Sequence, residues 1–203
     1  TSLSYSHTKD MFMQTTDTTE VSRTYVTQKN FASQDLSGIN ISFPIPARKW
    51  WMIFANINAN YVMLKANFEG RKLKNNYFTY SFYMEHTFTL PKDLSLNISG
   101  WYSGPSYWGG TFLTKPMGAL DAGIQKLLLN KKLTAKLSIS DIFVTSRWYA
   151  TSNFSGLYVN GNGNGESRQL RLNLSYRFGN SQVAKQRDRQ SGSSNERERI
   201  KSK

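Results

Sequence analysis

The sequence has no cysteine, so no disulfide can stabilise its fold. It also has no run of 18 apolar residues, which excludes a transmembrane helix. Its first residues, TSLSYSHTKD, lack the basic and apolar regions of a signal peptide. They are predicted to lie inside a strand, as expected for a fragment or a processed piece. Apolar residues at helical spacing are nearly absent, and the chain is therefore predicted to be all-β.

Apolar side chains are few overall, although aromatic ones are frequent. Hydrophobic residues make up 38% of the 203 residues and aromatic residues 14%. A soluble core of this size would draw on more Leu, Ile and Val. A β-barrel in lipid needs apolar residues at alternate positions only, so it can be built with a small share of them. The composition favours a membrane β-barrel. A soluble β-sandwich that acts as a binding module is the weaker alternative, because it would gather its aromatic residues in one core.

Alternation with a period of two residues predicts eight antiparallel strands. The clearest strand, 50–64, has apolar residues at its odd positions and Asn56, Asn58 and Asn60 on the opposite face. The other strands are predicted at 1–13, 25–43, 77–90, 94–103, 117–128, 132–148 and 167–178. The alternation is disturbed at Asp141, which indicates a β-bulge or the edge of the bilayer.

The predicted connections alternate between short and long. Short turns are expected at 44–49, 90–93 and 129–132, and longer loops at 14–24, 65–76, 104–116 and 150–166. Pro44 and Pro46 are assigned to the first turn, because proline cannot donate to a sheet ladder. Short periplasmic turns and long extracellular loops are typical of outer-membrane barrels. Aromatic girdles are expected at both ends: Trp50, Trp51, Tyr176 and Phe178 on the periplasmic side, and Trp101, Tyr102, Trp148 and Tyr149 on the outer side.

The two faces of the strands are expected to meet different surroundings. Lipid is predicted to contact Ile53, Ile57, Tyr61, Phe78, Phe82, Leu96, Leu172 and Leu174. The lumen is predicted to be lined by Asn56, Asn58, Asn60, Asn97, Arg171, Asn173 and Arg177, with Ser95 and Ser99. This lumen face could bind a solute, or it could be a hydrated wall that contacts a plug domain. The arginines have no evident carboxylate partner inside a small closed barrel, where burying them unpaired would be costly.

The last predicted strand and the residues after it differ sharply in composition. Leu170, Leu172, Leu174, Tyr176 and Phe178 alternate on one face, and we expect this strand to be the signal that the barrel-insertion machinery recognises by strand pairing. Residues 180–203 carry seven Lys or Arg and three Asp or Glu. The chain is thus divided into a barrel part, 1–179, and a basic, disordered periplasmic tail, 180–203.

Residues that could carry chemistry are explained better by structure than by catalysis. Gly161, Gly163 and Gly165 lack the strand–loop–helix context of a phosphate-binding loop and are expected in a flexible surface loop. The histidines, His7 and His86, lie far apart with no evident carboxylate cluster, so neither a metal nor a catalytic site is predicted. Asp141 is interpreted as a strand-end residue. We therefore predict no enzyme activity and no cofactor.

The net charge of +13 is spread over loops, strand ends and the tail, with no basic helix. Lipopolysaccharide phosphates and anionic lipid are the expected partners of these charges, and nucleic acid is not.

Several segments resemble one family. Three segments are similar to Bacteroidetes outer-membrane β-barrel proteins related to TonB-dependent receptors. They are the terminal RQLRLNLSYRFGN, the WYSG at 101–104, and a hairpin carried by Leu120, Asp121, Gly123, Gln125, Lys126, Asp141, Ile142 and Phe143. The resemblance covers most of residues 30–203. It implies a barrel of about 22 strands, of which these would be the last eight. It also implies nutrient import driven by TonB through an N-terminal plug domain, and neither that domain nor the remaining strands lie in this chain.

The leading hypothesis is therefore an antiparallel, up-and-down transmembrane β-barrel segment, about eight strands of a larger barrel, belonging to an outer-membrane transport receptor. The alternative is a small, self-closed eight-stranded barrel with an adhesion or structural role, since eight strands can close. A hydrogen-bonded contact between residues 3–12 and 170–178 would favour the alternative.

Overall fold

A computed structural model of the chain describes residues 1–20, 23–68, 71–154 and 157–178. In these ranges the chain forms β-strands and turns, and no helix there is long and apolar enough to cross a membrane. The strands are β1 (Ser2–Glu20), β2 (Arg23–Arg48), β3 (Trp51–Phe68), β4 (Arg71–Leu90), β5 (Leu94–Ser103), β6 (Ser106–Trp108), β7 (Phe112–Thr114), β8 (Met117–Leu128), β9 (Leu133–Ser140), β10 (Arg147–Phe154), β11 (Leu157–Asn164) and β12 (Gln169–Tyr176). The predicted tail, 180–203, lies outside the described residues.

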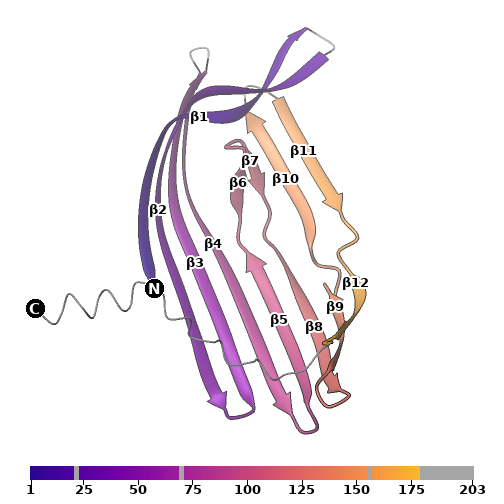
Figure 1. The fold of residues 1–203 in the computed structure, drawn as a ribbon. Helices are drawn as coiled ribbons and strands as arrows, with labels where there is room; N and C mark the ends of the chain where they lie inside the picture. The colour runs from indigo at the N-terminus through magenta and orange to yellow at the C-terminus, as the bar shows by residue number, and fades with distance from the viewer. Residues whose placement is uncertain (21–22, 69–70, 155–156, 179–203) are drawn as a thin grey trace, which may run out of the picture.

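Eight strands form one curved, open sheet (Figure 1). Their order is β1-β2-β3-β4-β5-β8-β9-β12, and every neighbouring pair is antiparallel. Within the described residues β1 and β12 are the two edges of the sheet. The prediction of an all-β, antiparallel meander of eight strands is confirmed, and the sheet does not close on itself.

The strands at the N-terminal side are longer than their alternation indicates. Segments 14–24 and 65–76 were predicted to be loops, but β1 and β2 pair as far as Glu20 and Arg23, and β3 and β4 pair as far as Phe68 and Arg71. Backbone pairing needs no apolar face, so a ladder can continue where alternation has ended. These extensions form one end of the sheet, which we call the extended end. The opposite, turn end carries the short connections at 49–50, 91–93 and 129–132.

The prediction that 44–49 is a turn is wrong. Strand β2 continues to Arg48, and Pro44 and Pro46 lie opposite Phe54 and Met52 of β3. The pairing of β1 with β2 runs only as far as Asn40 toward this end, so that side of β2 has no neighbour there among the described residues. Proline is tolerated on such an edge, because its missing N–H faces no acceptor.

A second, four-stranded sheet has the order β11-β10-β7-β6. Figure 1 shows it beyond the ends of β12, β9, β8 and β5, so it prolongs that half of the wall. Segments 104–116 and 150–166 were predicted to be loops, and most of their residues belong to this sheet. The glycines of NGNGNG also belong to it: Gly161 and Gly163 pair with Ala150 and Trp148. A Cβ added at Gly161 would lie 3.1 Å from the Trp148 ring, so the indole covers these glycines and replaces the missing side chains.

The β6–β7 turn is anchored on a small apolar cluster at the extended end. This apolar cluster consists of Met13, Ala32, Leu64 and Ala66, and Met13 and Leu64 are each only 1% exposed. Gly110 in the turn has a φ of +84°, and a Cβ added there would lie 3.0 Å from Leu64 and 3.1 Å from Met13. Glycine is required here both for its φ and for the close approach.

A corner at Asp141 separates β9 from β10, where a single strand, 132–148, was predicted. Asp141 has a φ of 44° and is 2% exposed. Its carboxylate accepts hydrogen bonds from the backbone N–H groups of Thr145 (2.8 Å) and Ser146 (3.0 Å), and its own N–H donates to Asp121 Oδ1 (2.7 Å). The disturbance expected at this residue is therefore the point where the strand leaves one sheet for the other.

Candidate functional site

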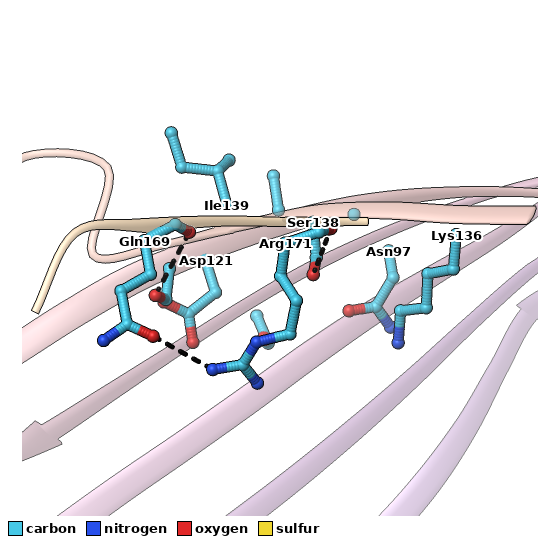
Figure 2. A pocket seen from close by; sticks show the side chains of 11 residues that line it. Asn97, Asp121, Lys136, Ser138, Ile139, Gln169 and Arg171 are labelled. Atoms are coloured by element: carbon cyan, nitrogen blue, oxygen red, sulfur yellow. Dashed lines mark hydrogen bonds between the residues drawn. The ribbon is translucent and has the colours of Figure 1, made fainter. Parts of the chain in front are cut away.

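The eight-stranded sheet has one polar face that runs across all of its inner strands. Residues directly opposite each other in an antiparallel pair share a face. The registers connect Ser42 to Asn56, Glu85 to Ser99, Ser99 to Asp121, and Ser138 to Arg171. We call this side, which holds Asn40, Ser42, Asn56, Asn58, Asn60, Ser81, Glu85, Thr87, Ser95, Asn97, Ser99, Asp121, Gln125, Lys136, Ser138, Arg171 and Asn173, the polar face. Figure 2 shows its residues on the concave side of the sheet and Ile139 on the opposite side.

The registers place most of the predicted lumen residues on this polar face, in two separate groups. Asn56, Asn58 and Asn60 lie on β3, where Asn56 Nδ2 donates to Ser42 Oγ (2.7 Å) and Asn60 Nδ2 donates to Asn58 Oδ1 (3.0 Å). Asn97 and Arg171 lie on β5 and β12 and line one common groove, and Asn173 lies opposite Lys136. Arg177 follows the end of β12, where its backbone N–H donates to the carbonyl of Lys132 (2.8 Å).

A carboxylate network at the centre of the polar face was not predicted from the sequence. Tyr83 Oη donates to Glu85 Oε2 (2.6 Å), while Thr87 Oγ1 (3.2 Å) and Asn97 Nδ2 (2.8 Å) donate to Glu85 Oε1. The alternation of Phe82, Met84 and Phe88 could have identified Glu85 as a residue of the opposite face. All of the donors to Glu85 are neutral, so its charge is held by hydrogen bonds.

A groove follows the polar face from β4 to β12. One part of it, about 350 Å³ in volume, is lined by Glu85, Thr87, Ser95, Asn97, Gly123, Gln125 and Lys136. A second part, about 200 Å³ in volume, shares Asn97, Gly123 and Lys136 with the first and adds Ser99, Asp121, Ser138, Gln169 and Arg171. Figure 2 shows Lys136, Asn97 and Arg171 directed into the same space. Arg171 Nη2 donates to Gln169 Oε1 (3.0 Å), which holds the guanidinium along the wall.

The corner residue Asp141 lies at the end of the strand, next to this groove. Burial alone would raise the pKa of Asp141, but hydrogen bonds from Ser167 and from the N–H groups of Thr145 and Ser146 bring its pKa below the ordinary carboxyl value. Thr145 Oγ1 also donates to the carbonyl of Gly118 (2.8 Å), which ties the corner to β8. Asp141 thus stabilises the corner through its hydrogen bonds, at the end of strand β9.

The opposite, apolar face carries two aromatic belts. At the turn end, Trp51 stacks on Phe88 (ring centroids 5.7 Å apart) and on His86 (5.8 Å), and Trp50 stacks on Trp51 (6.2 Å). Toward the extended end, Tyr80 contacts Phe78 and Tyr102, each at 6.0 Å. Among the lipid-face candidates, Ile57 lies between the belts, paired with Phe82, while Leu96 lies at the level of the turn-end belt, paired with Phe88. A strand rises about 3.3 Å per residue, so Trp51 to Tyr61 covers about 33 Å, or about 25 Å along the normal for a tilt of about 40°.

The belt toward the extended end, which we call the outer belt, differs in its residues from the aromatic girdle predicted for the outer side. Tyr102 belongs to it, but Trp101 lies opposite Tyr83 and Ala119 and therefore on the polar face. Trp148 and Tyr149 lie beyond the belt, in β10 of the second sheet. Tyr61 and Phe78, which are directly paired, complete the belt. An apolar band of this height, bordered by aromatic belts and backed by a polar concave face, is the architecture of a strand-built membrane wall.

Comparison with known families agrees with this architecture. Residues 1–176 match the outer membrane protein beta-barrel family. The chain belongs to this family. The chain matches none of the curated proteins and none of the solved structures with which it was compared. As a member of this family, it is a bacterial outer-membrane barrel protein.

The last strand of this outer-membrane barrel protein is exposed along its whole length. Leu170, Leu172 and Leu174 are 72%, 65% and 62% exposed, and Tyr176 and Phe178, which follow on the same side, are in edge contact at 4.7 Å. One side of β12 pairs with β9, and its other side is free in the described sheet. The role of these residues as an assembly signal remains a prediction.

The two histidines of the barrel, His7 and His86, lie in different surroundings. His7 Nδ1 lies 2.7 Å from Asp35 Oδ1, and Tyr5 Oη donates to the same oxygen (2.8 Å). His7 thus has one carboxylate neighbour, which the sequence alone did not indicate. His86 instead accepts a hydrogen bond from Trp51 Nε1 (3.2 Å). No group of three or more potential metal ligands occurs in the described part of the chain.

Proposed function

We propose that this chain forms the last strands in the wall of an outer-membrane transport receptor of the TonB-dependent type. The observation that carries the proposal is the open sheet, whose edge strands β1 and β12 are not paired with each other. In a larger barrel each edge pairs with a further strand, which satisfies its backbone groups in lipid. The resemblance to Bacteroidetes receptors supports about 22 strands for that complete barrel.

The polar face supports transport over a purely structural role. A closed eight-stranded barrel has an interior just wide enough to be filled by its own side chains. The groove here is instead lined by charged groups, among them Glu85, Asp121, Lys136 and Arg171. A wide barrel lets such residues meet water, solute or a plug domain. The small self-closed barrel with an adhesion or structural role is the competing proposal. We propose no catalytic activity for either.

The proposal includes several partners. A plug domain and the remaining strands would complete the receptor, TonB would act through the plug, and the insertion machinery would bind the strand Leu170–Phe178. Lipopolysaccharide would surround the outer belt. The basic residues of 180–203 would lie in the periplasm, since β12 ends on the side of the short turns.

Cysteine cross-linking can test the open sheet, because the chain has no cysteine of its own. Each double variant carries one Cys on β1, at Ser2, Ser4 or Ser6, and one Cys on β12, at Arg171, Asn173 or Ser175. Every combination of the two sets is made. Directly paired strand residues have Cα atoms about 4.5–5.5 Å apart, which suits a disulfide. The control is Lys136→Cys with Asn173→Cys, a direct pair. Cross-linking of the control but of no edge pair, in native outer membranes, is the expected result. An edge-to-edge disulfide within one chain would select the self-closed barrel.

A second measurement addresses energy coupling. Full-length protein purified from outer membranes should bind the purified periplasmic domain of TonB in a surface-binding assay. If the protein does not bind TonB although the cross-links show that β1 and β12 are not paired, the chain belongs to a large barrel that is not coupled to TonB.

A further inference from the structure

The groove on the polar face contains both acidic and basic side chains. The acidic ones accept several hydrogen bonds, whereas the basic ones have few partners. Both oxygens of Glu85 accept bonds from Tyr83, Thr87 and Asn97, and Asp121 Oδ1 accepts the N–H of Asp141. Among the described residues neither Lys136 nor Arg171 forms an ion pair, and Arg171 donates one side-chain bond, to Gln169. Arginine has five N–H donors and lysine three, so most donors of the two cations are unused.

The floor of the groove brings these cations to the same place. Gly123 of β8 lies opposite both Asn97 of β5 and Ser138 of β9, and Ser138 in turn lies opposite Arg171 of β12. A Cβ added at Gly123 would lie 3.7 Å from Lys136 Cε and 3.5 Å from Ser138 Cβ. A Cβ there would only touch the lysine stem, whereas a larger, branched side chain would reach into the space that the stem occupies. In Figure 2 the Lys136 and Arg171 side chains extend over the same strands, with the Asn97 amide beside Lys136.

We infer that this groove is an oxyanion site, which takes the carboxylate or phosphate group of a solute between Lys136 and Arg171. The inference rests on the proposed transport function and assigns its substrate class. Arg171 offers a planar fork that matches a carboxylate or phosphate, and Lys136 adds a point charge. Within the described residues, Glu85 and Asp121 accept hydrogen bonds from neutral donors and form no ion pair with Lys136 or Arg171, so the two cations can bind another anion. A plug carboxylate could use the same donors, and the test separates the two occupants.

The test measures binding of citrate and of pyrophosphate to the full-length protein in detergent by calorimetry at low salt. The wild type should bind at least one probe. Lys136→Gln and Arg171→Gln should each raise Kd by about tenfold, since each removes charge-assisted hydrogen bonds, and together by about 100-fold. The matched control is Lys126→Gln on β8, which removes the same charge from the apolar face and should leave Kd unchanged.

A second variant keeps the net charge. Gly123→Val should weaken binding several-fold by displacing the Lys136 stem, while the fold is checked by heat-modified gel mobility. If the groove variants leave Kd unchanged, if Lys126→Gln has the same effect as Lys136→Gln, or if neither probe binds, the inference is wrong. If the probes bind only after a plug domain has been removed, Lys136 and Arg171 bind a carboxylate of the plug and not a solute. The cysteine cross-links report separately on the proposed wall, so failure of the site and failure of the receptor proposal can be told apart.

Discussion

Replacing Gly110 by alanine is expected to detach the β6–β7 turn from the apolar cluster. An L-residue with a positive φ costs about 1–2 kcal/mol. The new Cβ would also lie 3.0 Å from Leu64 and 3.1 Å from Met13, both of which are fully buried and have little room to move. Overpacking of this kind costs about 1–3 kcal/mol. Together the two effects should destabilise the docked turn by roughly 2–5 kcal/mol.

Hydrogen exchange of the amides in 106–114 measures this local opening. Since about 1.4 kcal/mol corresponds to a factor of ten, exchange there should accelerate by about 30-fold or more. Gly165→Ala is the matched control, because a Cβ at Gly165 meets nothing within 4 Å. Unchanged exchange in the Gly110 variant, or an equal acceleration in the control, would refute the assignment of this turn to a strained, close-packed position.

Other perturbations test the wall, the corner and the terminal strand. Ile57→Arg should lower the free energy of unfolding in lipid vesicles by about 2–4 kcal/mol, while Asn58→Arg on the polar face should cost much less, and similar losses would contradict the assignment of the faces. Asp141→Asn should loosen the β9–β10 corner by about 1.5–3 kcal/mol, seen as faster exchange at 145–146. Because the folded pKa of Asp141 is lowered, its contribution is present above the ordinary carboxyl pKa and lost as the pH falls through the lowered one, and the variant should lack this dependence. Deleting Phe178 should reduce the amount of protein at the cell surface, whereas Phe178→Trp should preserve it. Normal surface labelling of the deletion variant would contradict the role of the last strand as an assembly signal.

The eight-stranded wall could be predicted because lipid imposes a pattern on the sequence. Between Ile53 and Asn60 every second residue must be apolar, and the pairing partners obey the same constraint. The second sheet could not be predicted in this way. Its glycine-rich strand β11 has no alternation, and the indole of Trp148, which covers Gly161, comes from the preceding strand. A contact of this kind appears only once the register is known.

The candidate site was predictable as a face but not as a groove. Alternation alone puts Asn97 and Arg171 on the same side of their strands. Which strands become neighbours decides that both line one groove with Lys136. Glu85 was missed because the alternation of 77–90 was followed on its apolar side only.

The extension of β3 beyond the outer belt determines the height of the rim at the extended end. From Tyr61 to Phe68 the strand rises by about 23 Å along its own direction, at about 3.3 Å per residue. Its ladder with β4 has no register shift over this length. Such a rim is a stiff collar that stands above the lipid headgroups, and its aperture is set by the number of strands. The collar itself has a fixed shape, and the Gly110 turn packs against its inner side.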